Sequence, residues 1–457
     1  MKNIIIGAGP AGRLAGLELG KLGEEVLLIE KNNLGGTCLN EGCMVICALN
    51  DIARFLNNKR QYEKLGLVKG NIEISYEEIV NKIIKTQEII HKIDHHENSS
   101  LNNEIVYGEA KITENEVTVD GESWDFENLL IATGGRPFMP NIPGKEHSLT
   151  HQDILKLKEV PEKLNIIGGG IIAAEVSNIY SSFGTEVNIL ARSGFLTELD
   201  EEIKDYVINN LFKDVNIYEN TSTEEIKKDK VLVKNNTSND KDNGEIKELD
   251  GTPFIATGRL PNSEIAKNIL DNDDFEKNGA IKVNDMLQTS KSNIYAAGDV
   301  IGGITLTPVA RMEGILAARN MAGYLSKVEY DTIPQSIALD MEVSFAKNSN
   351  NNKDNTNNNK ANTDNSDKNK NIDIKTPGSA GPGAFWRVLT RDTGITKASF
   401  NSKTNLLESI TAVSPSSVSD IAYLSYLMRI GENITNFDEF IEIHPSTDVF
   451  FQIMRDM

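Results

Sequence analysis

Apolar residues along this chain gather in short runs, and several of these runs are followed directly by glycines. Residues 4–6 are three isoleucines, the glycine-rich stretch 7–12 follows them, and a second apolar run, 26–29, ends at Glu30. Short continuous apolar runs are typical of strands buried on both faces of a parallel sheet. The pattern therefore predicts a strand, a glycine turn, a helix and a second strand.

The same unit returns at residues 164–192, where the turn carries Gly168, Gly170 and Ala173. A repeat of this kind predicts two dinucleotide-binding domains in one chain. Two further echoes support the duplication, because residues 129–137 and 253–261 both place an apolar strand before Ala-Thr-Gly. Another buried strand is predicted within 293–300, which ends at Gly298 and Asp299.

After about residue 330 the pattern changes to an α+β segment without dinucleotide turns. Residues 347–371 interrupt it with a polar, asparagine-rich stretch that has no aromatic or aliphatic residue larger than alanine. Such a stretch buries too little surface to offset its ordering entropy, so we expect a disordered surface loop. A shorter polar run, 235–245, is expected to form the exposed loop of a hairpin in the second domain.

Composition narrows the function classes. At 457 residues and 39% hydrophobic residues, the chain is expected to form two to four globular domains. A net charge of −20 argues against nucleic acid or an anionic membrane as the main partner, because phosphates would be repelled. No apolar run is long enough for a membrane span, and the glycines directly after residues 4–6 suit a buried strand better than a signal peptide. We therefore expect a cytoplasmic protein.

The glycine turns have a specific chemistry. In such a turn the first glycine permits the bend, the second lets the backbone approach a pyrophosphate, and the third lets helix and strand pack closely. The pyrophosphate then lies at the helix N-terminus, where free N–H groups favour negative charge. Glu30, eighteen residues after Gly12, is placed to accept hydrogen bonds from an adenosine ribose.

The second glycine turn is followed by a different residue at the position that distinguishes NADH from NADPH. Where a NAD site would carry an acid, this chain has Ala191, and Arg192 follows it. An arginine there can pair with a 2′-phosphate, so NADPH is slightly favoured over NADH. The alternative is that Arg192 is a solvated charge at the end of a strand.

All three cysteines lie within fifteen residues, at Cys38, Cys43 and Cys47. A pair such as Cys38 and Cys43, close to the start of a helix, can form a reducible disulfide with a lowered thiol pKa. A zinc site would need three or four ligands, and the six histidines show no matching spacing, so no metal is expected. Together with two dinucleotide turns, the cluster favours a redox disulfide over an inert core pair.

These motifs resemble the flavoprotein disulfide reductases, the class I pyridine nucleotide-disulfide oxidoreductases, over nearly the whole chain. The resemblance rests on both glycine turns, GTCLNEGC at 36–43, both Ala-Thr-Gly corners, Ala-Gly-Asp at 297–299, LTPVA at 306–310, and His444-Pro445. It implies an α/β fold with two Rossmann-like domains of the three-layer ββα type found in glutathione reductase, plus a C-terminal α+β dimerisation domain.

The resemblance also implies the domain order. Residues 1–150 and 266–330 would form the two parts of an FAD-binding domain, and 151–265 an NAD(P)-binding domain. Residues 331–457 would form the interface domain of a homodimer.

The resemblance further implies roles for single residues. Asp299 would hold the ribityl chain of FAD, Cys43 would lie against the flavin, and Cys38 would exchange with a dithiol or disulfide substrate. His444 would reach across from the other subunit as acid–base catalyst, which suits a side chain whose pKa lies near working pH. The other residues implied in the two cofactor sites are Gly7, Gly9, Pro10, Ala11, Gly12, Lys31, Gly36, Thr37, Thr133, Gly134, Gly168, Gly170, Ala173, Glu175, Gly258, Gly298, Thr307, Pro308 and Ala310.

The chain departs from the family pattern at two places. Cys47 stands where a lysine commonly pairs with the glutamate at Glu175, so we expect Glu175 to lack its cation and to have a raised pKa. Cys47 itself is interpreted as a small core residue, or alternatively as a third thiol that exchanges with Cys43. Near the C-terminus, Val449 stands where family members carry a glutamate that orients the histidine. Asp448 is the nearest candidate to replace it.

Within the family, GTCLN favours a dihydrolipoyl dehydrogenase-like enzyme. No cysteine follows Cys47, so the C-terminal redox pair of mercuric reductase and of the larger thioredoxin reductases is missing. The expected function is electron exchange between NAD(P) and a dithiol through FAD and the Cys38–Cys43 pair. The alternatives are an NADPH-dependent reductase of another low-molecular-weight disulfide, and a flavin-binding homologue without disulfide turnover.

Overall fold

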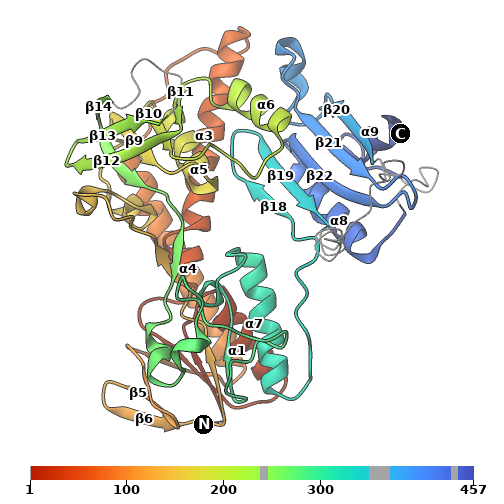
Figure 1. Ribbon diagram of the computed structural model, residues 1–457. Coiled ribbons are helices and arrows are strands. Elements are labelled where there is room, and N and C mark those ends of the chain that lie inside the picture. Colours follow the sequence, from red (N-terminus) through yellow and green to blue (C-terminus); the bar gives the residue numbers. More distant parts are fainter. Residues whose placement is uncertain (1, 237–244, 349–370, 434–440, 457) are drawn as a thin grey trace, which may run out of the picture.

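The computed structural model describes residues 2–236, 245–348, 371–433 and 441–456. Figure 1 shows three parts of the chain, two built around parallel sheets and a third, C-terminal part at their side. Both polar stretches singled out in the sequence, 347–371 and 235–245, lie largely outside the described residues.

The first parallel sheet has the strand order β17-β7-β1-β2-β3. Helices α1 and α7 cover one face of it, where Ile5 and Leu28 are buried, and a small antiparallel sheet covers the other, where Ile4 and Leu27 are buried. Covering both faces explains why its strands read as continuous apolar runs. The elements are β1 (Asn3–Ile6), α1 (Pro10–Lys21), β2 (Val26–Glu30), β3 (Glu104–Tyr107), β4 (Lys111–Ile112), β5 (Glu116–Val119), β6 (Glu122–Asp125), β7 (Asn128–Ile131), β17 (Ile294–Ala296) and α7 (Thr307–Met321).

The second parallel sheet, β11-β10-β9-β15, repeats this plan. A second antiparallel sheet, β12-β13-β14, packs on it through residues such as Ile226 and Val231. The elements are β9 (Lys163–Ile167), α5 (Ile171–Ser182), β10 (Glu186–Ala191), α6 (Glu201–Leu211), β11 (Val215–Glu219), β12 (Thr221–Lys227), β13 (Lys230–Asn235), β14 (Ile246–Asp250) and β15 (Thr252–Ile255). The two units confirm the predicted repeat and the three-layer ββα architecture.

Between the two sheets lie the segments that position the site. The short strands β8 (Gly135–Pro137) and β16 (Arg259–Pro261) follow the two Ala-Thr-Gly corners and pair with each other. The helices α2 (Gly36–Asn40), α3 (Cys43–Lys64) and α4 (Tyr76–Ser100) follow β2. Helix α3 has 22 residues and is therefore about 33 Å long. It packs against α5 and α4 through Val45, Leu49 and their neighbours.

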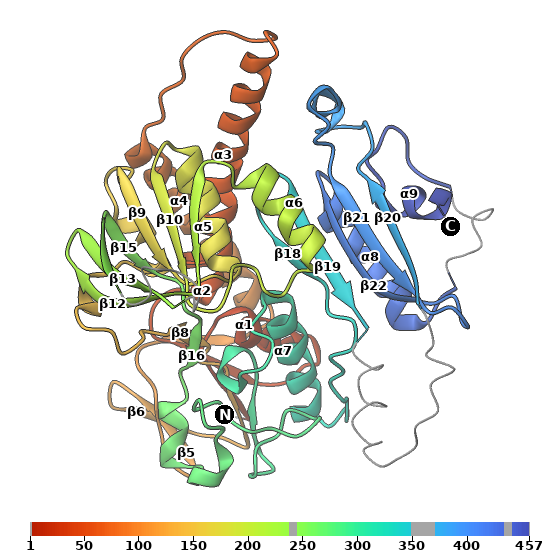
Figure 2. The same cartoon turned by 45° about the horizontal axis from the view of Figure 1, so that its top comes forward.

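The C-terminal part is an antiparallel sheet, β18-β19-β22-β21-β20, covered on one face by α8 and α9. Figure 2 shows α6 beside this sheet, and buried residues of α6 pack with Ile337 and Val343 of its strands. The elements are β18 (Gln335–Ile337), β19 (Glu342–Lys347), β20 (Ile372–Pro377), β21 (Ile395–Phe400), β22 (Leu407–Ser414), α8 (Ser417–Ile430) and α9 (Val449–Asp456). The predicted α+β segment after residue 330 is thus confirmed.

Short 3-10 helices occur at Lys145–His147, His151–Lys156, Glu264–Asn268, Asn272–Asp274, Asp299–Ile301 and Phe385–Thr390. Strand β7 ends at residue 131 and β17 begins at residue 294. The two strands are therefore neighbours in the first sheet although 163 positions separate them in the chain. The domain boundaries at 150, 265 and 330 stay predictions.

Candidate functional site

The first glycine turn joins β1 to α1 and leaves a backbone cradle. Gly7 has a φ of +98°, and a side chain there would collide with the carbonyl of Ala132. A side chain at Gly12 would collide with the carbonyl of Gly7, so helix and strand approach closely here. At Gly9, by contrast, a side chain would meet only the Cα of Gly36, in ordinary van der Waals contact at 3.9 Å. In the described part of the chain no side chain caps α1, so its first N–H groups are free to bind a phosphate.

Glu30 ends β2 directly beside this turn and is buried. Its carboxylate accepts hydrogen bonds from the backbone N–H groups of Ala8, at 2.7 Å, and Asn32, at 2.9 Å. Glu30 thus holds the glycine turn in place. Lys31, which follows it, is exposed.

The second turn, between β9 and α5, repeats this geometry. Gly168 has a φ of +135° and packs against the carbonyl of Ala256, while no atom lies near a side chain added at Gly170. Ala173 is fully buried, which suits the close packing expected at the third position. Arg192 is exposed directly after β10. The structure thus places the arginine at the edge where the adenosine end of a nucleotide would lie in such a domain.

The two predicted redox cysteines lie on α2 and at the start of α3, close to the first glycine turn. A side chain at Gly36 would run into the backbone of Gly9, so α2 packs tightly on the glycine turn. Cys38 lies on α2, and Cys43 is the first residue of α3. Both are free thiols, and a hydrogen bond links their side chains. The structure therefore brings Cys38 and Cys43 together beside the predicted FAD cradle.

The hydrogen bond from Cys43 lowers the pKa of Cys38 to about 6, despite the opposing effect of burial. Thr307 and the positive charge of Arg311 make smaller contributions to this lowered pKa. The pKa of Cys43 is raised, because losing its proton removes the same hydrogen bond. Such a pair loses one proton readily and the second with difficulty, and a thiolate is the form that attacks disulfides.

The N-terminus of α7 contributes to the same site. Thr307 Oγ1 lies 3.5 Å from Cys43 Sγ, and Pro308 and Ala310 follow in the first turn of this helix. Gly298 has a φ of +81° and precedes Asp299, and a side chain added at Gly298 would meet the side chain of Ala310. The LTPVA motif and the Ala-Gly-Asp motif are thus adjacent in space.

Asp299 has a partner that the sequence did not suggest. Arg259 Nε lies 2.9 Å from Asp299 Oδ2, and the same guanidinium donates to the Gly135 carbonyl. Arg259 Nη1 also lies 3.3 Å from Nε2 of the buried His151, whose pKa is lowered to about 4 by burial and by this cation. Arg259 directly follows the second Ala-Thr-Gly corner, and this position in the motif is the only sequence feature that could have marked Arg259 as part of the site.

A buried glutamate, Glu313 on α7, was also missed. It accepts hydrogen bonds from the Gly298 N–H at 2.7 Å and from the Tyr330 hydroxyl at 2.8 Å. Burial raises its pKa to about 7. No local pattern marks this residue, because its role depends on a loop fifteen residues earlier in the chain.

The two Ala-Thr-Gly corners support the segments between the sheets. Gly134 and Gly258 have φ values of +67° and +111°. Thr133 donates to the Asn262 carbonyl at 2.6 Å, which ties the first corner to the strand after the second. Thr37, on α2, is half-buried between the glycine turn and the cysteines.

The raised pKa expected for Glu175 is found in the structure, whereas its dependence on the missing lysine stays a prediction. Its carboxylate accepts the Ala338 N–H at 3.0 Å, and burial raises its pKa to about 7. The hydrogen bond from Ala338 opposes this rise in the pKa, and the nearby Cys43 adds to it.

The interpretation of Cys47 as a core residue is wrong. Cys47 is exposed and lines an apolar cavity of about 670 Å³ between α3 and α4. The neighbouring cavity wall still removes part of the water around its sulfur, and this partial desolvation, together with Cys43 and Glu175, raises the pKa of Cys47. Helical periodicity placed it correctly on the same face as Cys43, but the packing of α4 leaves this face open.

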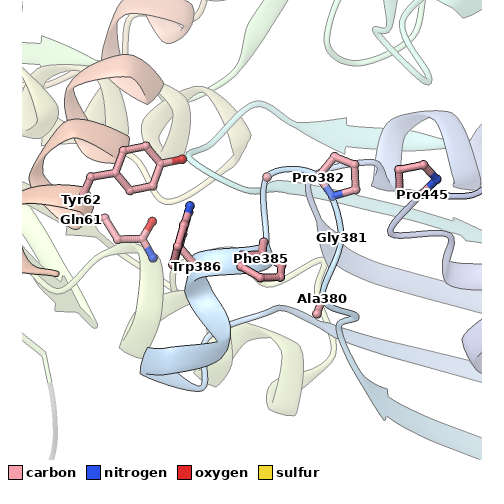
Figure 3. A pocket seen from close by; sticks show the side chains of 9 residues that line it. Gln61, Tyr62, Ala380, Gly381, Pro382, Phe385, Trp386 and Pro445 are labelled. Atoms are coloured by element: carbon pink, nitrogen blue, oxygen red, sulfur yellow. The ribbon is translucent and has the colours of Figure 1, made fainter. Parts of the chain in front are cut away.

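The C-terminal residues lie elsewhere in the same chain. His444 is exposed, and Pro445 lines a cavity together with Gln61 and Tyr62 of α3 (Figure 3). Gln61 lies eighteen residues after Cys43 on one helix, which corresponds to about 27 Å. One chain therefore does not bring His444 to its own cysteines.

Asp448 makes contacts at the start of α9. Its carboxylate accepts the N–H groups of Phe450, at 2.8 Å, and Phe451, at 3.1 Å, and the hydroxyl of Tyr423 at 3.1 Å. Among the residues the structure describes, we find no hydrogen bond between Asp448 and His444. The suggestion that Asp448 orients His444 stays a prediction, and its observed contacts are those of a helix cap.

The comparisons with known proteins establish the family. Residues 1–314 match the family described as pyridine nucleotide-disulphide oxidoreductase, and the chain belongs to it. The uncharacterized protein MJ0636 of Methanocaldococcus jannaschii is 31% identical, over 100% of this chain and 98% of that protein. Dihydrolipoyl dehydrogenase of Geobacillus stearothermophilus is 32% identical, over 75% of this chain and 74% of its own length.

The fold is that of a solved flavoprotein disulfide reductase. The HOCl-induced flavoprotein disulfide reductase RclA from Escherichia coli superimposes with a TM-score of 0.82 at 23% identity, covering 100% of this chain and 99% of that one. Within the described ranges, every helix is too short or too polar to cross a bilayer.

The residues present fit the cofactors of this family, FAD and a pyridine nucleotide. The open positions at Gly9 and Gly170, each before an uncapped helix, are cradles that a side chain would fill. The thiol pair lies between the first cradle and the start of α7. This arrangement suits an oxidoreductase that acts on sulfur groups.

Proposed function

We propose that this protein is an FAD-dependent NAD(P)-disulfide oxidoreductase of the dihydrolipoyl dehydrogenase type. The observation that carries the proposal is the hydrogen-bonded pair Cys38 and Cys43, placed against Thr307 and beside the first glycine turn. The similarity to dihydrolipoyl dehydrogenases supports the choice of a dithiol substrate.

The chemistry at sulfur follows from the two pKa values. The Cys38 thiolate attacks one sulfur of the substrate disulfide, which forms a mixed disulfide and releases one substrate thiolate. Cys43 then loses its proton and attacks Cys38 Sγ, which closes the Cys38–Cys43 disulfide and releases the second thiolate. Both thiolates gain protons, and His444 of a second copy is the proposed donor. The two cysteines lose two electrons and the substrate gains them.

The cofactor sites are assigned by position. FAD would be held by the first turn, Glu30 and Asp299, and the nucleotide by the second turn, with Arg192 favouring NADPH. When bound, FAD would carry electrons between the nicotinamide and the cysteine pair. Residues 1–150 with 266–330, 151–265 and 331–457 would then be the FAD, nucleotide and interface domains, and we place the enzyme in the cytoplasm because its thiols need reducing surroundings.

The site is completed by a second copy in this proposal. Ile441 and Ile443, which precede His444 in the chain, are 90% and 84% exposed. The apolar cavity between α3 and α4, with Cys47, Met44 and Phe55 in its wall, begins one helical turn from Cys43. We propose that Ile441 and Ile443 of the second copy bind in this cavity. Their binding there would bring His444 of the second copy close to Cys38 and Cys43 of the first copy.

Mixed subunits test the dimer. Cys43→Ser and His444→Ala copies are each expected to be inactive, and random mixing should restore about a quarter of the activity, since half the dimers then have one intact site. If mixed subunits stay inactive while wild-type subunits exchange under the same conditions, His444 does not act across the dimer.

An anaerobic titration of the purified yellow protein with dihydrolipoamide tests the function. Bleaching of the flavin absorbance by dihydrolipoamide supports the lipoyl assignment. Bleaching by NADPH alone, with turnover of another small disulfide, would favour the alternative reductase. Bound FAD without thiol-dependent turnover on any disulfide would favour a flavin-binding homologue.

A further inference from the structure

Helix α4 turns one stripe of side chains toward the rest of the protein, and this stripe changes from apolar to polar along the helix. The first part is apolar and buried, and it consists of Tyr76, Val80 and Ile83. The second part is polar, continues with the same helical spacing, and consists of Gln87, His91, Asp94 and Asn98. Three of these four polar residues are buried, and His91 is half-buried. Burial of polar side chains is costly unless they are hydrogen-bonded, so this polar stripe of α4 indicates specific partners.

Gln87 binds the C-terminal end of α2, the short helix that carries Cys38. Its Nε2 donates to the Leu39 carbonyl at 2.9 Å and to the Asn40 carbonyl at 3.1 Å. The last carbonyls of a helix have no partner within the helix, so Gln87 supplies donors that α2 itself lacks. Helix α2 has five residues, and a helix this short is not stable by itself. The position of Cys38 therefore depends on contacts such as those of Gln87.

His91, one helical turn beyond Gln87, orients the last side chain of α2. Asn40 Nδ2 donates to the carbonyls of Leu34, at 3.1 Å, and Gly36, at 2.9 Å, so its Oδ1 faces the other way. His91 Nε2 lies 2.7 Å from this oxygen and must carry the hydrogen, because an amide oxygen has none to donate. The hydrogen bond from His91 thus fixes the amide that ties the end of α2 to its beginning.

The rest of the polar stripe contacts α1, the helix that follows the first glycine turn. Asp94 Oδ1 lies 3.0 Å from Arg13 Nη1 on α1. A side chain added at Gly16 of α1 would meet Asn98 Oδ1 at 3.3 Å, so the two helices pack closely there. One stripe of one helix therefore holds both the helix of the proposed FAD cradle and the helix of Cys38.

The polar character of this stripe serves precision more than stability. Hydrogen bonds within a protein replace hydrogen bonds to water, so their net contribution to stability is modest, whereas their directions fix the groups that they join. Thiol–disulfide exchange needs such precision, because a misplacement of about 1 Å can lower the rate of a reaction about a hundredfold. The sulfur of Cys38 has to meet both a substrate sulfur and Cys43.

We propose that Gln87 and His91 are positioning residues, which hold α2 so that Cys38 stays within reach of Cys43 and at a fixed distance from the FAD cradle. Each acts through the backbone or the Asn40 amide of α2, and neither acts on a sulfur atom. The proposal rests on the proposed function, in which Cys38 exchanges with the substrate.

Four variants of the full-length flavoprotein test the proposal. Gln87→Met keeps the length of the side chain and loses both donors, and His91→Leu loses the donor to Asn40. His91→Gln is the rescue variant, because its amide can donate to the same oxygen. His95→Leu is the matched control, since His95 is exposed on the same helix and contacts Ser99 of α4 itself.

The first measurement is the pH dependence of iodoacetamide alkylation at Cys38 in the reduced protein, which requires neither substrate nor turnover. Gln87→Met and His91→Leu should weaken the hydrogen bond from Cys43 and raise the pKa of Cys38 from about 6 toward the ordinary thiol value. His91→Gln and His95→Leu should leave this pKa close to that of the wild type.

The second measurement is steady-state turnover of dihydrolipoamide. Gln87→Met and His91→Leu should lower kcat about tenfold with little change in KM, because the position of Cys38 matters in the exchange step rather than in binding. His91→Gln should recover most of the lost kcat. Gln87→Met is close to isosteric and decides the outcome by itself if His91→Leu does not fold.

The proposal is overturned if Cys38 is alkylated with the same pH dependence in Gln87→Met and His91→Leu as in His95→Leu. A loss of stability or of bound FAD with unchanged alkylation of Cys38 overturns it too, because a purely structural role gives that result. If the alkylation profile shifts and His91→Gln restores it, while the wild type turns over no dithiol or disulfide, the positioning role stands and the proposed function fails. If all variants turn over dihydrolipoamide at the wild-type rate, the proposed function stands and the positioning role fails.

Discussion

Cys43 Sγ lies 3.5 Å from Thr307 Oγ1, so the first residue of α3 and the first residue of α7 meet at the candidate site. These residues are 264 positions apart in the chain. The contact joins the cysteine motif to the LTPVA motif, and it helps to set the acidity of the thiol pair.

The low pKa of Cys38 is predicted to depend on Cys43. Cys43→Ala removes the hydrogen bond and should raise the pKa of Cys38 from about 6 toward the ordinary thiol value. Thr307→Val should raise it less. The pH dependence of iodoacetamide alkylation at Cys38 in the reduced protein, followed by peptide mass, measures both. Cys47→Ser is the control and should shift it little, because Cys47 makes the last and weakest contribution. An unchanged Cys38 pKa in Cys43→Ala would contradict the prediction.

Glu175 is predicted to respond to a restored cation. Cys47→Lys places a positive charge one helical turn from Cys43 and should lower the pKa of Glu175 from about 7. The carboxyl stretch in infrared difference spectra against Glu175→Gln measures the protonation state, with Cys47→Met as an uncharged control. If Cys47→Lys and Cys47→Met titrate alike, the missing lysine is not the reason for the raised pKa.

Stability is predicted to fall with rising pH because of Glu313. Its pKa rises from 4.5 in an ordinary setting to about 7 in the fold, so between these values the native state binds more protons than the unfolded state. The contribution is complete below pH 4.5 and is lost as pH rises to about 7, by up to about 3 kcal/mol. Glu313→Gln should flatten this part of the profile in urea unfolding. An equally steep profile in Glu313→Gln would assign the slope to other groups.

Arg387 is predicted to be costly to remove. Arg387→Met leaves Asp340 and Asp392 without their cation in a buried place and should lower the free energy of unfolding by about 3 to 5 kcal/mol. Lys230→Met removes an exposed ion pair with Glu248 and should lower the free energy of unfolding far less, because exposed ion pairs contribute little to stability. Denaturant titration of both variants compares them. Similar losses would mean that the buried Arg387 cluster stabilises the fold no more than an exposed ion pair does.

Several features were readable from the sequence because their causes are local. The strands around Ile4 and Ile166 follow from continuous apolar runs, and the turns at Gly7 and Gly168 follow from backbone conformations that favour glycine. The helix after Cys43 and the shared face of Cys43 and Cys47 follow from helical periodicity. In each case residues close in sequence carry the physical cause.

Tertiary structure alone decided what these residues touch. The ion pair of Arg259 with Asp299, the burial of Glu313 under Gly298, and the open cavity beside Cys47 each depend on segments that meet only after the chain has folded. The same holds for His444, which lies far from the cysteines of its own chain. The family resemblance predicts that it acts on the cysteines of the other subunit. Local patterns determine which backbone forms, whereas partners, burial and thus pKa values arise from packing between distant segments, and a single sequence carries no direct record of that packing.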